Sequence, residues 1–567
     1  MTVTRVLILD GYTDEPAGLG VPPYIDVYPR YIAGAIWSID KSIYIKYITV
    51  DEARKDVHNF LRTAQEYNLV IVVAGVTVPG KYLGGTPIKL EELEQWFRII
   101  SKPIKVLVGP AAKFGIGIEG GRIAELPNKV KKNFDTIVKG DSELYVYELL
   151  KYGVEKADPS VIREDYELTN RFAIIGAKIV KQHPNYGLNL IAEIETYRGC
   201  PRVITGGCSF CIEPGYGLPV FREPEDIVKE VKALYDMGVR HFRLGRQPDL
   251  LAYKAFDTGK EEFPKPNTEV LKKLFHGIRS IAPNIETLHI DNVNPGTIAH
   301  HEHESVEALK IIVEYHTPGD VAALGIESAD PRVIKLNNLK VYPDEAFKAI
   351  EIINKIGSRR GWNGLPELLP GINFVYGLIG ETKDTYRLNY EFLKKVLNAG
   401  LLIRRINIRQ VIAFPTTRMW KYGDSIIRRH KAIFKVYKEK IRREIDLPML
   451  RRLVPTGTIL HKVFTEEHLG EHTLARQVGS YPLLIDIPLK LELHKWIDIV
   501  IVDHGYRSVT GIPCPLNVNT APLRVLQLVP GISKTEVLEI IKRRPIKTFN
   551  ELKNIVNPYS IKYLTVQ

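Results

Sequence analysis

The chain has 567 residues, of which 45% are hydrophobic and 25% charged, with a formal net charge of +12 and only four cysteines. This length exceeds one hydrophobic core and predicts several domains, while so few cysteines exclude a disulfide-stabilised scaffold. Because it has neither a signal peptide nor a run of about 18 apolar residues, the sequence predicts a cytoplasmic protein with no membrane segment. The positive charge indicates an acidic partner such as a nucleic acid, although thermophile proteins also carry many charged residues for stability alone.

Residues 1–160 alternate buried strands with amphipathic helices. Apolar runs at 5–10, 68–75, 104–110 and 135–141 are typical of parallel strands buried on both faces. Gly and Asp follow several of these runs, where doubly wound sheets place their ligand loops. We therefore expect a Rossmann-like or flavodoxin-like domain.

Residues 185–420 repeat the alternation with about six further strands, which predicts a full or partial (β/α) barrel with its chemistry at the C-terminal strand ends. A basic helical connector follows at 421–453, and then a β-rich segment at 454–512 with the size of a small five-stranded barrel. Residues 513–567 are helical again. The expected fold class is α/β and multidomain.

Three of the four cysteines, Cys200, Cys208 and Cys211, lie together directly after the first strand of the barrel. They are too few for a tetrahedral zinc site, because no other Cys or His lies nearby. A [4Fe–4S] cluster held by three thiolates would keep one iron free to bind a substrate or cofactor. Three unrelated buried cysteines are the alternative, but their clustering argues against it; the fourth, Cys514, is expected to be a packed thiol.

The segment CSFC at 208–211 and the stretch that follows it resemble the radical S-adenosylmethionine (SAM) superfamily, in particular its methylthiotransferase branch. The resemblance covers about 190–420 and includes the segments LGRQPD, GIES and YGLIGE in the family's order. It implies that the open iron binds SAM, and that an electron from the cluster cleaves SAM to methionine and a 5′-deoxyadenosyl radical. It also implies a reductase or ferredoxin as the electron donor.

The resemblance assigns roles to individual residues. Cys200, Cys208 and Cys211 match the catalytic cluster ligands, and Phe210 matches the aromatic residue that packs near adenine. The other matches to segments that contact SAM are Gln247 or Asp249, Glu327, Gly377, Gly380 and Glu381. One departure is the seven-residue spacer between Cys200 and Cys208, where most relatives have three; the catalytic subunit of Elongator also has a longer spacer. Gly206 and Gly207 allow the extra residues to loop out.

The N-terminal segment lacks two features of related enzymes. Residues 1–199 contain no cysteine, which excludes a second thiolate-bound cluster there and with it ordinary methylthiolation. The segment also resembles cobalamin-binding domains, but LDGYTDEPAG stands where many of them carry a cobalt-binding histidine. Base-on cobalamin needs no such histidine, so cobalamin is possible but not favoured. A domain that packs on the barrel and shapes substrate access is the preferred interpretation.

The last two segments resemble nucleic-acid-binding modules. Residues 454–512 are loosely similar to the TRAM domain, a small OB-like β-barrel, and His472, Arg476, Tyr481 and Arg507 are its candidate contacts. Residues 513–567 resemble a helix-hairpin-helix, whose hairpin N–H groups can bind phosphate. Its candidate nucleic-acid residues are Gly531, Lys534, Lys542, Arg543 and Arg544.

The sequence therefore predicts a radical SAM enzyme that modifies tRNA or another nucleic acid. One alternative is a cobalamin-dependent radical SAM methylase that acts on a small molecule or protein. The other is a non-catalytic Fe–S protein that binds nucleic acid, and similar helix-hairpin-helix domains can also bind protein.

Overall fold

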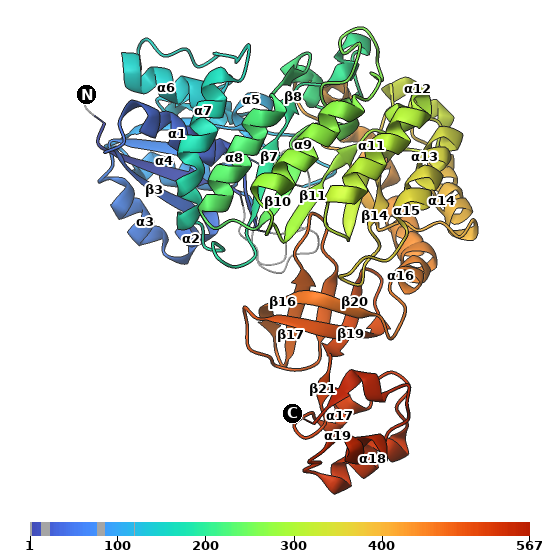
Figure 1. Cartoon of the computed structure of the whole chain (residues 1–567). Helices are drawn as coiled ribbons and strands as arrows, with labels where there is room; N and C mark the ends of the chain where they lie inside the picture. The colour runs from blue at the N-terminus through green and yellow to red at the C-terminus, as the bar shows by residue number, and fades with distance from the viewer. Residues whose placement is uncertain (1–2, 13–22, 76–85, 118, 567) are drawn as a thin grey trace.

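The structure is a computed structural model that describes residues 3–12, 23–75, 86–117 and 119–566. Its N-terminal domain lies beside an α/β barrel, a small β-barrel lies below the α/β barrel, and the C-terminal helices lie at the far end (Figure 1). None of the described helices combines the length and apolarity needed to cross a membrane.

The N-terminal domain is built on a five-stranded parallel sheet with the order β3-β1-β4-β5-β6. In chain order this is 2-1-3-4-5, the flavodoxin-like arrangement of a doubly wound fold, so the prediction of an α/β domain with a parallel sheet is confirmed. Its strands are β1 (Arg5–Asp10), β3 (Tyr44–Thr49), β4 (Leu69–Val73), β5 (Ile104–Val108) and β6 (Thr136–Ile137). Its helices are α1 (Val27–Ile39), α2 (Val50–Lys55), α3 (Val57–Ala64), α4 (Leu90–Ile99), α5 (Pro110–Phe114) and α6 (Ser142–Tyr152), and α7 (Glu167–Gly176) follows. Most of the predicted cobalamin-type loop after β1 lies outside the described residues.

The second domain is a partial barrel made of two parallel sheets, with the orders β2-β7-β10-β11 and β12-β13-β14-β15. Its strands are β7 (Ile191–Glu195), β10 (His241–Gly245), β11 (Thr287–Ile290), β12 (Asn292–Val293), β13 (Asp320–Glu327), β14 (Leu368–Tyr376) and β15 (Arg405–Gln410). Its helices are α8 (Pro224–Asp236), α9 (Thr268–Ile281), α10 (Pro295–His300), α11 (Glu302–Tyr315), α12 (Pro331–Asn337), α13 (Pro343–Gly357) and α14 (Lys383–Asn398).

The N-terminal domain and the barrel share one hydrophobic core. Strand β2 (Tyr24–Ile25) leaves the N-terminal segment and pairs with β7, which adds a strand to the barrel's sheet. Helix α1 is buried along almost its whole length, and Arg30 within it forms an ion pair with Glu230 of α8. One continuous cluster of buried side chains runs from β1 to the helices of the barrel. The barrel is therefore held rigidly against the N-terminal sheet.

A connector of two helices, α15 (Ser425–Ile441) and α16 (Leu447–Leu453), leads to a closed barrel with the strand order β16-β17-β18-β20-β19. Its strands are β16 (Ile459–Leu469), β17 (His472–Gln477), β18 (Leu484–Ile487), β19 (Trp496–His504) and β20 (Ser508–Pro513). The C-terminal elements are β21 (Leu516–Asn517), α17 (Leu523–Leu526), α18 (Lys534–Arg543), α19 (Phe549–Lys553) and β22 (Leu564–Thr565). A small β-barrel is thus present at the expected place, while its TRAM-like character stays a prediction.

The small β-barrel packs on the N-terminal ends of the barrel strands. Asn189, just before β7, donates a hydrogen bond of 2.6 Å to Glu466 of β16. Arg404, just before β15, donates one of 3.0 Å to the carbonyl oxygen of Tyr481. Because the cysteines follow the opposite, C-terminal end of β7, the small barrel and the cysteines lie at opposite ends of the α/β barrel.

Candidate active site

The three cysteines lie on one loop that leaves the C-terminal end of β7. Cys200 is buried, while Cys208 and Cys211 are partly exposed. The spacer between the first two forms a short 3-10 turn that ends at Gly206 and Gly207, with φ angles of 81° and 61°. L-residues with side chains rarely adopt this left-handed conformation, so the two glycines allow the spacer to loop out as predicted.

Asn337, the last residue of α12, anchors the cysteine loop. Its side-chain oxygen accepts a hydrogen bond of 2.6 Å from the hydroxyl of Ser209, and its main-chain oxygen accepts one from the Ser209 N–H. The Asn337 amide donates to the carbonyl oxygen of Ile379, in the turn after β14. This asparagine therefore ties the cysteine loop to the YGLIGE turn, and no sequence pattern singled it out.

Arg202 is the only charged residue of the spacer, and the structure buries it beside the thiols. It donates a hydrogen bond of 3.0 Å to Sγ of Cys208 and one of 2.8 Å to the carboxylate of Glu262. A guanidinium at this distance stabilises a thiolate electrostatically. Sequence reasoning missed this residue, although its position as the lone charge between two cysteines was a usable signal.

The three thiols lie close enough to one another to interact electrostatically. Burial raises the pKa of Cys200 to about 12 and raises the pKa of Cys211 well above its usual range, with Glu213 and the other two cysteines adding to the second shift. In the described parts of the chain, no three His, Cys, Asp or Glu side chains converge on a single ion. A [4Fe–4S] cluster binds each thiolate to a different iron, so its ligands surround the cluster rather than meet at one point. A donor set of three neighbouring thiols fits such a cluster.

Phe210, between the last two cysteines, packs with Cys208 on an apolar cluster at the C-terminal ends of the strands. Leu378 follows β14 and Val411 follows β15 in this cluster. The aromatic ring therefore lies at the end of the barrel that carries the cysteines, as its predicted role beside adenine requires.

Glu327, at the end of β13, is the most unusual predicted SAM residue. Its φ angle is 67°, which is strained for a residue with a side chain, and its side chain is buried. Burial raises its pKa to about 7, against the opposing charges of Lys340 and Arg409. Lys340 Nζ lies 4.0 Å from the carboxylate, which makes no hydrogen bond to any residue that the structure describes. This geometry leaves the carboxylate available to a polar ligand.

Gln247 and Asp249 follow β10, and both are already hydrogen-bonded within the protein. The Gln247 side chain donates to the carbonyl oxygen of Leu244 and accepts from Thr196. The Asp249 carboxylate accepts from the N–H of Leu251, the N–H of Asn294 and the hydroxyl of Thr297, while burial raises its pKa to about 6. The side chains shape the loop after β10, and a direct contact of either with SAM stays a prediction.

The YGLIGE turn after β14 is held by its own glutamate. Glu381 accepts hydrogen bonds from the N–H of Gly377, the hydroxyl of Tyr386 and the ring of His430. Gly377 and Gly380 adopt φ angles of 90° and 84°, which explains both glycines. The turn is therefore preformed, and the hydrogen bonds of Glu381 stabilise it.

A buried ion network links the N-terminal domain to the cysteine loop. Asp141, just after β6, accepts two hydrogen bonds from the guanidinium of Arg198, which precedes Cys200 by two residues. Arg163 donates its N–H to the same carboxylate at 2.7 Å and forms an ion pair with Glu195 at 3.0 Å. These charges hold the pKa of Asp141 far below its usual range. The GDSE segment at residues 140–143 therefore positions the start of the cysteine loop.

The predicted nucleic-acid residues of the small β-barrel are not gathered on one face. Arg476 is buried and forms an ion pair with Glu466 at 2.7 Å, which removes its side chain from the predicted binding surface. His472 is half-exposed, and its Nδ1 lies within hydrogen-bond distance, 2.7 Å, of the Asp486 carboxylate. Arg507 and Tyr481 line a pocket against the α/β barrel.

In the C-terminal helices, the N-terminus of α18 is capped from within the chain. Ser533 accepts from the N–H of Glu536, and the Glu536 carboxylate accepts from the N–H of Ser533. A carboxylate at this position competes with the phosphate that we expected at the hairpin, where Gly531 has a φ angle of 78°. Of the predicted basic residues, Arg544 donates a hydrogen bond to the carbonyl oxygen of Ala521. The other three, Lys534, Lys542 and Arg543, are exposed.

Comparison with known proteins identifies the barrel. Residues 194–408 match the radical SAM superfamily, and this range contains the three cysteines and every predicted SAM residue. The chain is 50% identical over 519 residues to an uncharacterised protein of Methanocaldococcus jannaschii, covering 90% of this chain and 93% of that one. It is 44% identical to one of Archaeoglobus fulgidus, covering 99% of both. A radical S-adenosylmethionine methyltransferase from Kitasatospora setae is similar in structure, with a TM-score of 0.49 and 15% identity over 73% of this chain and 75% of that chain.

Proposed function

This chain belongs to the radical SAM superfamily, and from that premise we propose that it cleaves SAM reductively in order to modify a nucleic acid, with tRNA as the first substrate to test. The observation that carries the chemistry is the set of three thiols on one loop at the C-terminal end of β7. Cys514, the fourth cysteine, follows β20 in the small β-barrel, at the other end of the α/β barrel. Formation of 5′-deoxyadenosine by the reduced protein tests this chemistry.

We assign a separate role to each group of residues at the site. Cys200, Cys208 and Cys211 would hold a [4Fe–4S] cluster with one open iron, Arg202 would stabilise the thiolate of Cys208, and a reductase or ferredoxin would supply the electron. When bound, the cluster would donate an electron to SAM, which then breaks into methionine and a 5′-deoxyadenosyl radical. Phe210 would pack near the adenine, and the carboxylate of Glu327, which has Lys340 beside it but no hydrogen-bond partner among the described residues, would accept hydrogen bonds from SAM.

Anaerobic reconstitution should load each chain with about four irons and about four sulfides, because the chain offers one set of three clustered cysteines. Iron and sulfide assays on protein freed of unbound metal measure this ratio. A content of about eight irons would contradict the single cluster.

The nucleic-acid part of the proposal is supported by the net charge of +12 and by the exposed Lys534, Lys542 and Arg543 near the two ends of α18. These residues belong to α18, which lies beyond the small β-barrel in the C-terminal module (Figure 1), whereas the cysteines follow the C-terminal end of β7, at the opposite end of the α/β barrel. A ligand that contacts both the basic residues of α18 and the cysteine loop must extend along the α/β barrel. A polymer such as tRNA meets this requirement, whereas a mononucleotide does not.

Replacing Lys534, Lys542 and Arg543 together with Gln should weaken tRNA binding similarly for all sequences, because phosphate contacts position an RNA without reading its bases. The slope of log affinity against log salt concentration should become shallower by up to about three, since each lost phosphate contact reduces it by about one. Replacing Lys229, Lys232 and Lys273 on the outer helices of the barrel with Gln is the control, since it removes the same charge elsewhere. Equal effects of the two triple variants would argue against a specific contact by the C-terminal helices.

A cobalamin-dependent methylase is the second candidate, and one feature of the N-terminal domain favours it. A cavity of about 490 Å³ opens beside α4, between Thr86–Glu91 and the segment around Ile116, and reaches Ile412 of the barrel. It lies near the C-terminal ends of the sheet's strands, where doubly wound folds bind ligands. Roughly stoichiometric corrinoid in protein produced with cobalamin present would favour this candidate over the nucleic-acid enzyme.

A further inference from the structure

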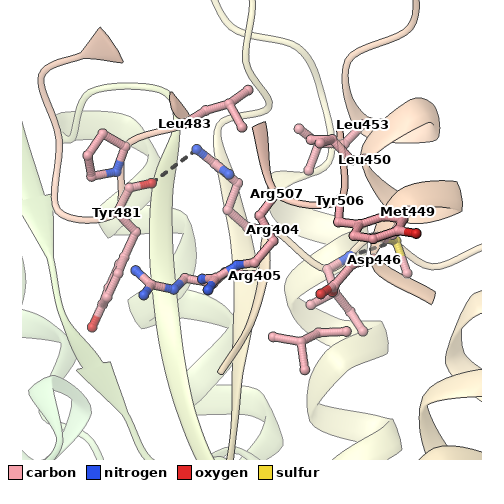
Figure 2. Close-up of a pocket in the computed structure, with 13 residues that line it drawn as sticks. Arg404, Arg405, Asp446, Met449, Leu450, Leu453, Tyr481, Leu483, Tyr506 and Arg507 are labelled. Atoms are coloured by element: carbon pink, nitrogen blue, oxygen red, sulfur yellow. Dashed lines mark hydrogen bonds between the residues drawn. The ribbon is translucent and has the colours of Figure 1, made fainter. Parts of the chain in front are cut away.

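A cavity of about 50 Å³ lies where the small β-barrel meets the α/β barrel. Arg404 and Arg405 enter it from the start of β15, Arg507 from the loop between β19 and β20, and Asp446 from the residue before α16. Figure 2 shows the three arginines in the centre, with Tyr481 on one side and Asp446 on the other.

The positive charges of this cavity have no matching negative charges. Among the residues that the structure describes, Asp446 supplies the one carboxylate in the cavity lining, and that carboxylate forms an ion pair with Arg442. In the described part of the chain, Arg404, Arg405 and Arg507 take part in no ion pair, and Nε of Arg404 is buried without a hydrogen-bond partner. Elsewhere this protein pairs its buried arginines with carboxylates, as in Arg30 with Glu230.

Each arginine also keeps most of its donors free. Arg404 donates to the carbonyl oxygen of Tyr481 at 3.0 Å, and Arg405 donates from Nε to the side chain of Asn407 at 2.6 Å. A guanidinium carries five N–H donors, so further hydrogen bonds can be made by both side chains. The guanidinium of Arg405 lies over the ring of Tyr481, with its central carbon 4.9 Å from the ring centroid.

Partial burial of the three side chains and their mutual repulsion make this arrangement costly unless an anion binds. Burial, together with the charges of neighbouring arginines, lowers the pKa of Arg404 to about 10, of Arg405 to about 9 and of Arg507 to about 10. All three side chains are still cationic at neutral pH. Charges that are buried without partners destabilise a fold unless a ligand of opposite charge compensates them.

We propose that the cavity formed by Arg404, Arg405 and Arg507 binds a phosphate group. Guanidinium donors match phosphate oxygens in pairs, which favours phosphate over other anions. Since one water needs about 10–15 Å³ of such space, a cavity of about 50 Å³ accommodates a group of several heavy atoms. The phosphate can belong to a small phosphorylated molecule or to an RNA backbone. The inference goes beyond the proposed function and does not require SAM cleavage.

Titration of cluster-loaded, full-length protein with inorganic phosphate, in phosphate-free buffer without SAM or reductant, tests the proposal. We expect binding by calorimetry and a higher melting midpoint with phosphate. Arg404→Gln and Arg405→Gln should each weaken binding about tenfold or more, because each removes charge-assisted hydrogen bonds. Arg451→Gln is the matched control, since Arg451 is exposed on the neighbouring helix α16, and it should bind phosphate like the unaltered protein.

A second readout separates a phosphate site from a purely structural cluster. In phosphate-free buffer, Arg405→Gln should melt no lower than the unaltered protein, because it removes a charge that nothing compensates. A lower midpoint for Arg405→Gln, undiminished binding by the Arg404→Gln/Arg405→Gln double variant, or no phosphate binding at all would overturn the proposal.

Binding experiments with tRNA distinguish the two possible sources of the phosphate group. If the site holds an RNA phosphate, inorganic phosphate should compete with tRNA, and Arg405→Gln should weaken tRNA binding. If it holds a small phosphorylated molecule, Arg405→Gln should weaken phosphate binding about tenfold or more and leave tRNA binding unchanged. Either result supports a phosphate site, and both are independent of whether the protein forms 5′-deoxyadenosine.

Discussion

Reduced, cluster-loaded protein should convert SAM to 5′-deoxyadenosine, and Cys208→Ala should lower the yield to background. Cys208 is one of three thiols on the loop after β7, and its sulfur accepts a hydrogen bond from Arg202. Losing one of the three thiolates removes a protein ligand of the cluster, so the cluster should not assemble. Chromatography of the products after anaerobic reduction measures the yield, and absorbance of the cluster is recorded in parallel.

Cys514→Ala is the matched control for this experiment. Cys514 is the only cysteine outside the loop, and it lies after β20 in the small β-barrel. Its removal should leave the iron content and the yield of 5′-deoxyadenosine unchanged. If Cys514→Ala also abolished the cluster, the three-thiolate assignment would be wrong. If the reduced, cluster-loaded protein never produced 5′-deoxyadenosine, a non-catalytic Fe–S protein would be the better interpretation.

Asp141→Asn should destabilise the protein by about 3–5 kcal/mol, the range for breaking a buried ion pair by removing one partner. The carboxylate of Asp141 binds Arg198 and Arg163, and all three side chains are at least nine-tenths buried. An amide cannot balance two buried guanidinium groups. Denaturant unfolding followed by fluorescence measures the loss, and Trp37 and Trp96 report on the N-terminal domain.

The exposed pair Lys232–Asp236 provides the control, because Asp236→Asn should change stability by less than about 1 kcal/mol.

The contribution of Asp141 should also depend on pH. Its folded-state pKa is depressed, so its stabilisation is fully present above about pH 4, the usual carboxyl pKa, and is lost as the pH falls toward the folded-state pKa. Because Arg198 lies two residues before Cys200, Asp141→Asn should also lower iron per chain. Equal stability losses in both variants would contradict the role assigned to the network.

Local patterns in the sequence were enough to predict the strands, the helices and the grouping of three cysteines after a strand end. Buried apolar runs such as 69–73 form parallel strands because each is covered on both faces. Cys200, Cys208 and Cys211 lie on one loop at a strand end because they are close in the chain. The left-handed angles at Gly206, Gly207, Gly377 and Gly380 follow from what only glycine adopts without strain.

Contacts between distant segments were decided by the tertiary structure alone. Arg476 follows the alternating pattern of a strand, and nothing local shows that Glu466 pairs with it in the interior. Arg404 and Arg507 are about a hundred residues apart, and they meet because the small β-barrel docks on the N-terminal ends of the barrel strands. The sequence by itself determined the strands, the turns and the cluster of cysteines, since these depend on neighbours along the chain. Which charges are buried, paired or left uncompensated depends on how the domains pack, and so only the folded chain decided it.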